Sequence, residues 1–389
     1  MASTPAAWAN VVSALAIAVA IASGLSILHG ARHVVSASLA SARARACLVY
    51  CSGDLLDAVQ TLMLFNDSKT FVDMPMRADP EEITRKFAAL RRPLTKEILS
   101  DFVGRYFYEA GSDVLTHVPE DWVPKPPLVI RLGSEEAKNW VMDLMDKWRV
   151  LGRKTADSVA KYPQRTSTLF REHPFVVPGG RFRESYYWDT YWIVKGLLEC
   201  SMTLTATNVV QNLLNDVTTF GFVPNGGRVY YVTRTQPPLL APMVADVYEA
   251  TSDTDFLASA VQVLDKEYQF WMDETNLRVV SVPAPAGDSS VITGDSKIQP
   301  KVYTLNRYYS KDDTPRPESY REDLETRAAG GDCREIRSAA ESGWDFSSRW
   351  MESDSKTKTG SARDWNLTEI RITNVIPVDL NSFMYKMED

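Results

Sequence analysis

The chain has 389 residues, 44% of them hydrophobic and 24% charged, and its formal net charge is −7. This composition is typical of a globular protein, and the acidic balance argues against a nucleic-acid partner, which usually meets a basic surface. Histidine is scarce, so a Ser–His–Asp triad or a histidine-rich metal site is disfavoured and carboxylates are the better acid–base candidates. The four histidines are His29, His33, His117 and His173.

An apolar segment lies close to the N-terminus. Residues 8–28 carry no charge and are long enough to span a bilayer, for which roughly 20 apolar residues are needed. A cleaved signal peptide is an alternative, because small residues at 40–46 lie near a possible cleavage site. A leader with no targeting role and a plastid-type leader are further alternatives. Residues 1–46 are therefore predicted to form an apolar anchor or signal segment and a linker.

The flanks of this segment give conflicting signals about the side of the membrane. Arginines follow the segment but none precedes it, so the positive-inside rule places the body in the cytoplasm. Glycosylation sequons at Asn66 and Asn366 suit an exported body instead. We expect a protein of the secretory pathway, either anchored in the plasma membrane or extracellular.

The cysteines do not form a recognisable framework. They are Cys47, Cys51, Cys200 and Cys333. Four scattered cysteines in a chain of this length match neither a disulfide scaffold nor a zinc motif. Cys47 and Cys51 are four residues apart and share one face of a possible helix, but individual buried or free thiols are expected for all four.

From about residue 47 the spacing of apolar residues is mostly helical. An aspartate followed by Pro80 opens one helix, and Ser134 caps another. No clear series of strand-like alternation appears, and the region 280–342, rich in Pro, Asp and Arg, is predicted to form long surface loops. The helical stretches are expected at 53–65, 79–92, 134–163, 188–202, 205–219, 239–250 and 254–274.

Two segments share a Gly-Gly-Arg motif. "PGGRFRESYY" begins at residue 178 and "PNGGRVYY" at residue 224, and the motifs themselves, starting at Gly179 and Gly226, are 47 residues apart. That offset is about one helical hairpin with its loop. It is consistent with helical hairpins arranged in a ring, each of which sends a loop to the same end of an all-α (α/α) toroid.

A site for a neutral, hydroxyl-rich ligand needs arginines, carboxylates, amides and aromatic rings together. Each hydroxyl is both donor and acceptor, and burying it unpaired is costly. Four segments offer this mixture: 181–189, 224–238, 316–319 and 341–350. Their candidate residues are Arg181, Phe182, Trp188, Asp189, Asn225, Arg234, Gln236, Arg316, Glu318, Gly343 and Asp345.

Structural alternatives exist for these residues. Arg181 and Asp189 could form an ion pair within their own segment, and Glu184 could bind Arg183. Asn225 could simply mark a turn before two glycines, and "RPES" (316–319) could be a solvated loop.

Asp345 lies among aromatic residues, with Trp344 before it and Phe346 and Trp350 after it. Desolvation by such neighbours raises the pKa of a carboxyl, as a general acid requires. A helix cap is the alternative role for this aspartate.

Taken together and in this order, the segments resemble the trehalases of glycoside hydrolase family 37. The matching blocks are "LFNDSKTFVDMP", "PGGRFRESYYWDTYW", "PNGGRVYYVTRTQPPLLAPMV", "RPESYRED", "ESGWDFSSRW" and "IPVDLN". The resemblance runs from about residue 51 to residue 389, and the last segment and the apolar N-terminus suggest a plant-like relative. It implies an (α/α)6 barrel over residues 47–389 that hydrolyses α,α-trehalose to two glucoses with inversion.

The resemblance also implies roles for individual residues. Asp345 corresponds to the general acid, and the small disaccharide trehalose is the expected partner, with no metal or organic cofactor. Arg316 and Arg349 should pair with other groups, since they would otherwise lower the pKa of the acid, and Glu318 is the predicted partner of Arg316. The implied substrate-binding positions are Arg181, Phe182, Trp188, Asp189, Asn225, Arg234, Thr235, Gln236, Arg316, Pro317, Glu318 and Gly343, with Thr235 and Pro317 contributing backbone.

The sequence departs from the family pattern at its C-terminus. Three features of the family have no counterpart here: the second family motif, which is built around Gln-Trp-Asp; a glycine-rich loop; and the glutamate assigned as base. Trp-Asp occurs only at 188–189 and 344–345. The last helix is expected to start near Asp379 and to end almost at once.

We therefore expect a C-terminally truncated barrel with little or no trehalase activity. The alternatives are a short form that binds sugar or regulates without turnover, a site in which Glu318 or Asp189 is the base, and another inverting hydrolase on the same toroid.

Overall fold

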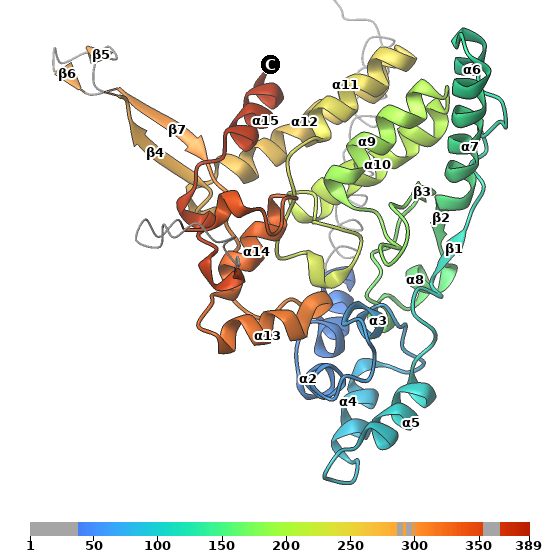
Figure 1. Cartoon of the computed structure of the whole chain (residues 1–389), viewed down its shortest axis with the longest axis vertical. Helices are drawn as coiled ribbons and strands as arrows, with labels where there is room; N and C mark the ends of the chain where they lie inside the picture. Colours follow the sequence, from blue (N-terminus) through green and yellow to red (C-terminus); the bar gives the residue numbers. More distant parts are fainter. Residues whose placement is uncertain (1–37, 286–290, 293–297, 300, 353–365) are drawn as a thin grey trace, which may run out of the picture.

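The computed structural model describes residues 38–285, 291–292, 298–299, 301–352 and 366–389, and these residues are mostly helical (Figure 1). The expected all-α class is therefore confirmed. Short 3-10 helices connect the main elements. They are η1 (Pro163–Arg165), η2 (Val229–Tyr231), η3 (Glu274–Asn276), η4 (Pro317–Ser319), η5 (Ser348–Trp350), η6 (Leu367–Glu369) and η7 (Ile372–Asn374).

The first helices form one cluster around a shared apolar core. A helix over residues 38–50 is followed by α2 (Asp54–Thr61), α3 (Lys69–Val72), α4 (Pro80–Ala88) and α5 (Lys96–Tyr106). Pro80 stands in the first turn of α4, as predicted, where its missing N–H costs no hydrogen bond. The buried side chains that these helices share include Val49, Leu56, Phe71, Ile83, Leu99 and Phe107.

A small sheet follows, and it corrects one predicted helix. After β1 (Val114–Thr116) and α6 (Leu128–Arg131), helix α7 (Glu135–Leu151) starts at the expected cap, where Ser134 Oγ accepts from the Ala137 N–H. The helix predicted to reach residue 163 ends at Leu151. The chain continues as β2 (Gly152–Thr155), which pairs antiparallel with β1 and β3 (Phe175–Val176), and then as α8 (Asp157–Lys161).

Gly152 explains this change of structure. A Cβ atom at residue 152 would lie 2.2 Å from the carbonyl oxygen of His117, so only glycine lets the new strand approach β1 so closely.

Two helical hairpins form the centre of the molecule. They are α9 (Tyr187–Glu199) with α10 (Thr203–Phe220), and α11 (Leu240–Thr251) with α12 (Thr254–Met272), packed side by side around a common core (Figure 1). Because consecutive helices are antiparallel, the start of α9, the end of α10, the start of α11 and the end of α12 share one end. The loops that hold the two Gly-Gly-Arg motifs therefore meet, and Tyr186 is bridged to Gly226.

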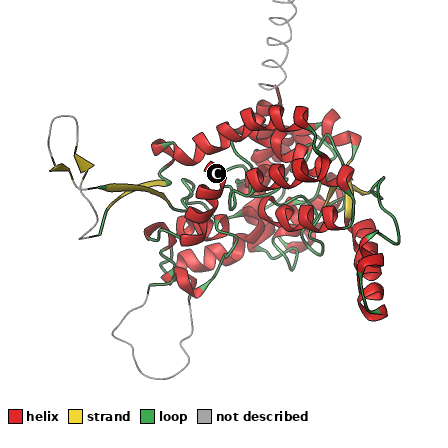
Figure 2. Ribbon diagram, turned by 90° about the horizontal axis from the view of Figure 1, so that it is seen from above, coloured by secondary structure: helices red, strands yellow, loops and turns green. Residues whose placement is uncertain are grey.

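The region 280–342 is not the series of long loops that was predicted. Strands β4 (Val279–Pro283) and β7 (Val302–Asn306) pair antiparallel into a ribbon that projects from the helical body (Figure 2), with β5 (Val291–Ile292) and β6 (Ile298–Gln299) beyond it. Helices α13 (Tyr320–Ala328) and α14 (Cys333–Glu341) follow. The β-branched residues of β4 favour a strand, and Asp332 Oδ1 caps α14 by accepting from the Arg334 N–H.

The last element is α15 (Val378–Glu388), which packs against α11 and β7. It begins within one residue of the predicted position and runs to Glu388, so the expectation that it ends almost at once is wrong.

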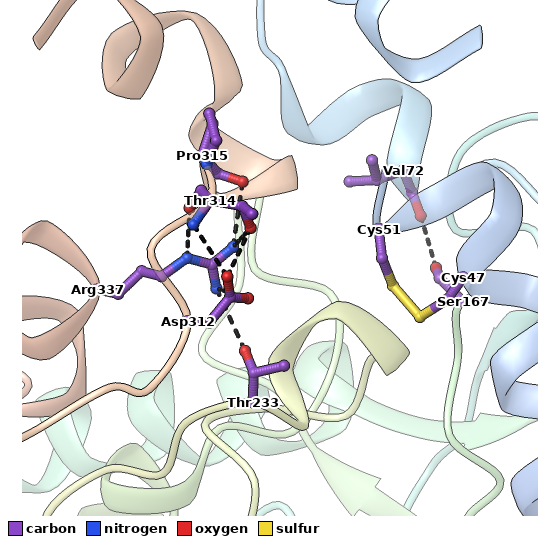
Figure 3. The surroundings of a disulfide bond; sticks show 9 residues. All are labelled: Cys47, Cys51, Val72, Ser167, Thr233, Asp312, Thr314, Pro315 and Arg337. Carbon is purple, nitrogen blue, oxygen red and sulfur yellow. Dashed lines mark hydrogen bonds and ion pairs between the residues drawn. A yellow bond between two sulfur atoms is a disulfide. The ribbon is translucent and has the colours of Figure 1, made fainter. Parts of the chain in front are cut away.

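The cysteines correct a second prediction. Cys47 and Cys51 are joined by a disulfide (Figure 3), with Cα atoms 4.6 Å apart, a separation that a disulfide readily bridges. Cys47 lies in the last turn of the helix over residues 38–50 and Cys51 follows its end, where the Cys51 N–H donates to the Cys47 carbonyl at 3.1 Å and keeps the two residues close. Cys200 and Cys333 are free and buried, as expected.

Among the described helices, none combines the length and the apolar character that a membrane span requires. The predicted apolar segment 8–28 lies outside the described residues, so the anchor and the domain boundary at residues 46 and 47 remain predictions.

Candidate active site

Loops at the shared end of the two central hairpins enclose a cavity of about 310 Å³, a size suited to a small ligand. Of the predicted site residues, all except Thr235 and Pro317 line it, and these two are buried within the segments that do. The lining residues are Arg181, Phe182, Trp188, Asp189, Asn225, Arg234, Gln236, Arg316, Glu318, Gly343 and Asp345. The fold thus brings the four predicted segments together, while the roles of the residues remain predictions.

A second, larger hollow of about 440 Å³ lies between the helix over residues 38–50, α8 and α10. None of the predicted site residues lines it, and most of its wall is apolar. The smaller cavity is therefore the candidate active site, because residues of all four predicted segments line it.

The start of α9 presents Trp188 and Asp189 to the cavity. The Tyr187 N–H donates to the Asn225 carbonyl at 3.2 Å, and the Trp188 N–H donates to Gln236 Oε1, also at 3.2 Å. The segment 225–236 thereby satisfies amide groups in the first turn of α9 that have no partner within the helix. This contact fixes two of the predicted segments against each other.

Asn225 is more than a turn residue. Its side-chain oxygen accepts from Arg234 Nε at 2.8 Å, and its backbone N–H donates to the Arg234 carbonyl at 2.9 Å. Arg234 Nη2 in turn donates to Glu318 Oε1 at 2.7 Å. Burial opposes ionisation of Glu318, but the charges of Arg234 and Arg316 outweigh it and hold the pKa of Glu318 at about 2.

The predicted partner of Arg316 is wrong. Arg316 binds Asp323, with Nε to Oδ2 at 2.9 Å and Nη2 to Oδ1 at 2.7 Å, and the Arg316 backbone N–H also donates to Oδ2 at 2.7 Å. Asp323 lies in the first turn of α13, which folds back over the 316–319 segment, whereas Glu318 faces Arg234. The broader expectation holds, because the other arginine near the acid, Arg349, pairs with Asp379 at 2.7 Å.

Arg181 is held by Asp67, which was not among the predicted site residues. Its Nε donates to Asp67 Oδ2 at 2.7 Å and its Nη2 to Asp67 Oδ1 at 2.6 Å, so the alternative pairing with Asp189 does not occur. The Nη2 group also reaches the Glu318 carbonyl at 3.2 Å. Asp67 belongs to the "LFNDSKTFVDMP" block, and the resemblance of this block to the family is the sequence feature that could have indicated Asp67.

Glu184 is buried and structural, as one alternative held, but its partner is not Arg183. Its carboxylate lies 2.8 Å from Lys69 Nζ and 3.1 Å from Arg228 Nε. Arg183 donates instead to the carbonyl oxygen of Ala110 at 2.8 Å.

Asp345 follows a tight turn at the end of α14. Gly343 has a φ of +70°, and a Cβ atom there would lie 2.6 Å from Cε2 of Trp188, so this position requires glycine. The capping alternative is not supported, because Ser347 caps the next short helix, η5. Burial raises the pKa of Asp345, against the opposing charges of Arg316 and Arg234.

Asp189 is the second carboxyl with a raised pKa in the cavity. Burial is the main cause, and the negative charge of Asp345 adds to it. The charge of Asp345 thus makes ionisation of Asp189 less favourable, as expected for acids that share one poorly hydrated site.

The cavity wall also contains residues that were not among the predicted site residues. Tyr186 donates to Glu184, and its hydroxyl lies 2.8 Å from that of Tyr231. Each tyrosine follows one of the two Gly-Gly-Arg motifs, which was the signal that could have found them. The other additions are Ser319, Ala340 and Phe346.

Metal ligands do not converge in the part of the chain that the structure describes, where no group of three or more His, Cys, Asp or Glu side chains could hold an ion. The cavity instead combines a carboxyl of raised pKa, anchored arginines and aromatic rings. This combination offers the hydrogen-bond donors, acceptors and apolar faces that a neutral, hydroxyl-rich small molecule needs.

The family model for trehalases matches residues 63–389, and the chain belongs to that family. Human trehalase is 39% identical over 351 residues, which make up 88% of this chain and 56% of that protein. A probable trehalase of rice, Oryza sativa subsp. japonica, is 37% identical over 330 residues, or 83% of this chain and 54% of that protein. The chain therefore spans about half the length of the relatives it matches.

The plant-like character remains a prediction, because the identities to the human and rice proteins are similar. Among solved structures, the neutral trehalase Nth1 from Saccharomyces cerevisiae matches with 25% sequence identity and a TM-score of 0.39. The match covers 56% of this chain and 38% of that one.

Proposed function

We propose that the cavity binds α,α-trehalose and that Asp345 is the general acid for its hydrolysis to two glucoses. The observation that carries this proposal is the placement of Asp345, a carboxyl whose pKa is raised by burial, among lining residues from all four predicted segments. Membership of the trehalase family gives the substrate class.

The chemistry follows from the groups present. A protonated Asp345 donates its proton to the glycosidic oxygen, so that the bond to one glucose breaks as the leaving hydroxyl forms. Arg181, Arg234 and Arg316 are each fixed by a carboxylate, so they offer their remaining N–H groups to sugar hydroxyls without a large cost in side-chain entropy. The rings of Trp188 and Phe182 supply apolar faces for the sugar.

Inversion requires a second carboxylate that activates a water on the opposite face of the sugar, roughly 6.5–9.5 Å from the acid. Among the described residues that line the cavity, Glu318 and Asp189 are the other carboxyls. Glu318, with a pKa of about 2 and an ion pair to Arg234, is a weak base. We therefore propose that inversion is the stereochemical outcome and that turnover by this chain alone is low, with Asp189 as the remaining candidate base.

Calorimetry with trehalose and a glucose-release assay test this proposal. The protein and its Asp345→Asn variant should both bind trehalose in preference to maltose, and any glucose release should disappear in the variant. Release that persists in Asp345→Asn would exclude Asp345 as the acid. Binding without any release in the unaltered protein would favour the alternative of a sugar-binding protein without turnover.

We also propose that the chain enters the secretory pathway, with residues 8–28 as the membrane anchor or signal segment. The sequon residues Asn66 and Asn366 are both exposed, so both can accept a glycan. Expression in a eukaryotic cell should give a protein whose gel mobility increases after removal of N-linked glycans. The Asn66→Gln/Asn366→Gln variant should lose that change, and a mobility unaffected by deglycosylation would contradict the proposal.

A further inference from the structure

One carboxylate joins two walls of the candidate active site without lining the cavity. Glu341 is the last residue of α14 and is completely buried. Its Oε1 accepts from the Thr235 N–H at 3.0 Å and from Arg278 Nη2 at 2.5 Å, and its Oε2 accepts from the Tyr309 N–H at 2.9 Å. Both oxygens are therefore engaged, and one of these hydrogen bonds is between charged groups.

The residues on either side of these contacts face the cavity. Thr235 lies between Arg234 and Gln236, which both line it. On the other side, Glu341 is followed within four residues by the turn that carries Gly343 and Asp345. The hydrogen bond from the Thr235 N–H to Glu341 thus connects the segment 225–236 directly to the base of the turn that presents Asp345.

A second link between α14 and this segment lies one helical turn earlier. Arg337 Nη1 donates to Thr233 Oγ1 at 3.2 Å, and its Nε donates to the Thr314 carbonyl at 2.6 Å (Figure 3). Because Arg337 keeps the segment attached to the helix, loss of the Glu341 contacts should shift the two walls relative to each other rather than separate them.

We propose that Glu341 is a positioning residue that sets the placement of Asp345 relative to Arg234 and Gln236. This inference rests on the proposed function of the cavity. A glutamine at position 341 has the same shape, but its amide group would place a donor against the N–H of Tyr309 or against the donors of Thr235 and Arg278. One side of the contact must then break, and the two walls must shift relative to each other.

Glu335 provides a matched control. It is a mostly buried carboxylate of the same helix, and it also accepts from a backbone amide, that of Thr373 at 3.0 Å, and from the Thr373 hydroxyl. Thr373 does not belong to the cavity wall. Glu335→Gln therefore also removes a largely buried negative charge from α14 but leaves the cavity segments in place.

The first measurement needs no ligand. The ring of Trp188 packs against Gly343, so the 19F resonance of 5-fluorotryptophan at this position, assigned with Trp188→Phe, reports on the distance between the walls. Glu341→Gln should shift this resonance and Glu335→Gln should not. The second measurement is trehalose affinity by calorimetry, which should fall about tenfold in Glu341→Gln and change less than about twofold in Glu335→Gln.

The two measurements separate this inference from the proposed function. If the unaltered protein does not bind trehalose, the proposed function fails, while the 19F shift still decides the positioning role. An unshifted Trp188 resonance in folded Glu341→Gln, or equal shifts in both variants, would overturn the inference. If Glu341→Gln does not fold, Arg278→Lys replaces it. This variant should shift the Trp188 resonance less and lower the trehalose affinity about two- to fivefold. An unshifted Trp188 resonance in Arg278→Lys would overturn the inference.

Discussion

Glu318 shows how charge pairing within the cavity stabilises the fold. Its pKa is about 2, against a usual value of 4.5, although burial acts in the opposite direction. Because the pKa is lower in the folded state, the stabilisation is fully present above pH 4.5 and is lost as the pH falls towards 2. The shift corresponds to about 3 kcal/mol.

The prediction is that Glu318→Gln lowers the free energy of unfolding at pH 7 by about this amount, since Arg234 loses its buried anionic partner. Urea unfolding at pH 7 and at pH 3 measures the effect, and the variant should show a smaller loss of stability between these values. Glu322→Gln, which removes an exposed carboxylate of α13, is the control and should follow the unaltered protein. Parallel pH dependence in all three proteins would contradict the prediction.

Gly343 leads to a second prediction at the level of single residues. Alanine there would place its Cβ 2.6 Å from the rigid ring of Trp188, so the ring must move away from its place in the cavity wall. Gly343→Ala should therefore weaken trehalose binding, as measured by calorimetry. Gly180→Ala is the control, because Gly180 also has a positive φ, +62°, but no atom lies within 4 Å of its added Cβ. Equal affinities in the two variants would contradict the role of the Trp188 contact.

Residue types in the candidate site were predictable from the sequence, but their partners were not. The match of four segments to a family pattern identified Arg181, Arg316 and Glu318. Each of the two arginines pairs with an aspartate, Asp67 or Asp323, that the sequence pattern did not indicate as its partner. Asp67 lies 114 positions from Arg181, so this pairing depends on how separate loops pack, which no local pattern records.

At the scale of the elements, the junction between α9 and α12 contains a buried titratable group. Glu267 of α12 accepts a hydrogen bond from the Tyr187 hydroxyl at 2.7 Å, and the same hydroxyl accepts from the Leu240 N–H of α11 at 3.0 Å. Burial raises the pKa of Glu267 from 4.5 to about 7, although the bond from Tyr187 favours the charged form. The contribution of Glu267 to stability is therefore greatest below pH 4.5 and falls as the pH rises through 7.

The prediction is that this loss amounts to about 3 kcal/mol between pH 4.5 and pH 8. Glu267→Gln should remove it, because the amide oxygen still accepts from Tyr187 while no charge is buried. Urea unfolding at pH 5 and pH 8 tests this expectation. A variant that is less stable than the unaltered protein at pH 8 would show that the ionised carboxylate stabilises this junction.

The helices were predictable where apolar periodicity and capping residues agree, as in α7, which Ser134 caps, and in α9 to α12. Prediction failed where glycine and tertiary pairing override periodicity. Gly152 ends α7 because the chain must approach β1, although the helical pattern continues in the sequence. The pairing of β4 with β7 joins two segments that are far apart in the sequence. Each strand is only five residues long, so neither one alone indicates that the other is its partner.

At the scale of the whole molecule, a buried ionic network joins the N-terminal helices to the cavity segments. Lys69 of α3 contacts Asp73 at 2.5 Å and Glu184 at 2.8 Å, and Arg228 lies 3.1 Å from Glu184. All four residues are almost completely buried. Glu184 belongs to the first Gly-Gly-Arg segment and Arg228 to the second, so the network fixes both segments to the first helical cluster.

The last prediction concerns this connection. Glu184→Gln removes the negative charge that Lys69 and Arg228 share, so these two buried cations are no longer fully neutralised. It also removes the carboxylate that accepts from the Tyr186 hydroxyl. The free energy of unfolding should fall by about 3–5 kcal/mol, and because the network links the two cores, fluorescence and circular dichroism should report one shared shift of the urea midpoint. Asp146→Asn, which breaks an exposed pair with Arg149 at 2.7 Å, should cost less than about 1 kcal/mol. Similar losses in the two variants would mean that Glu184 does not hold the segments to the helical cluster.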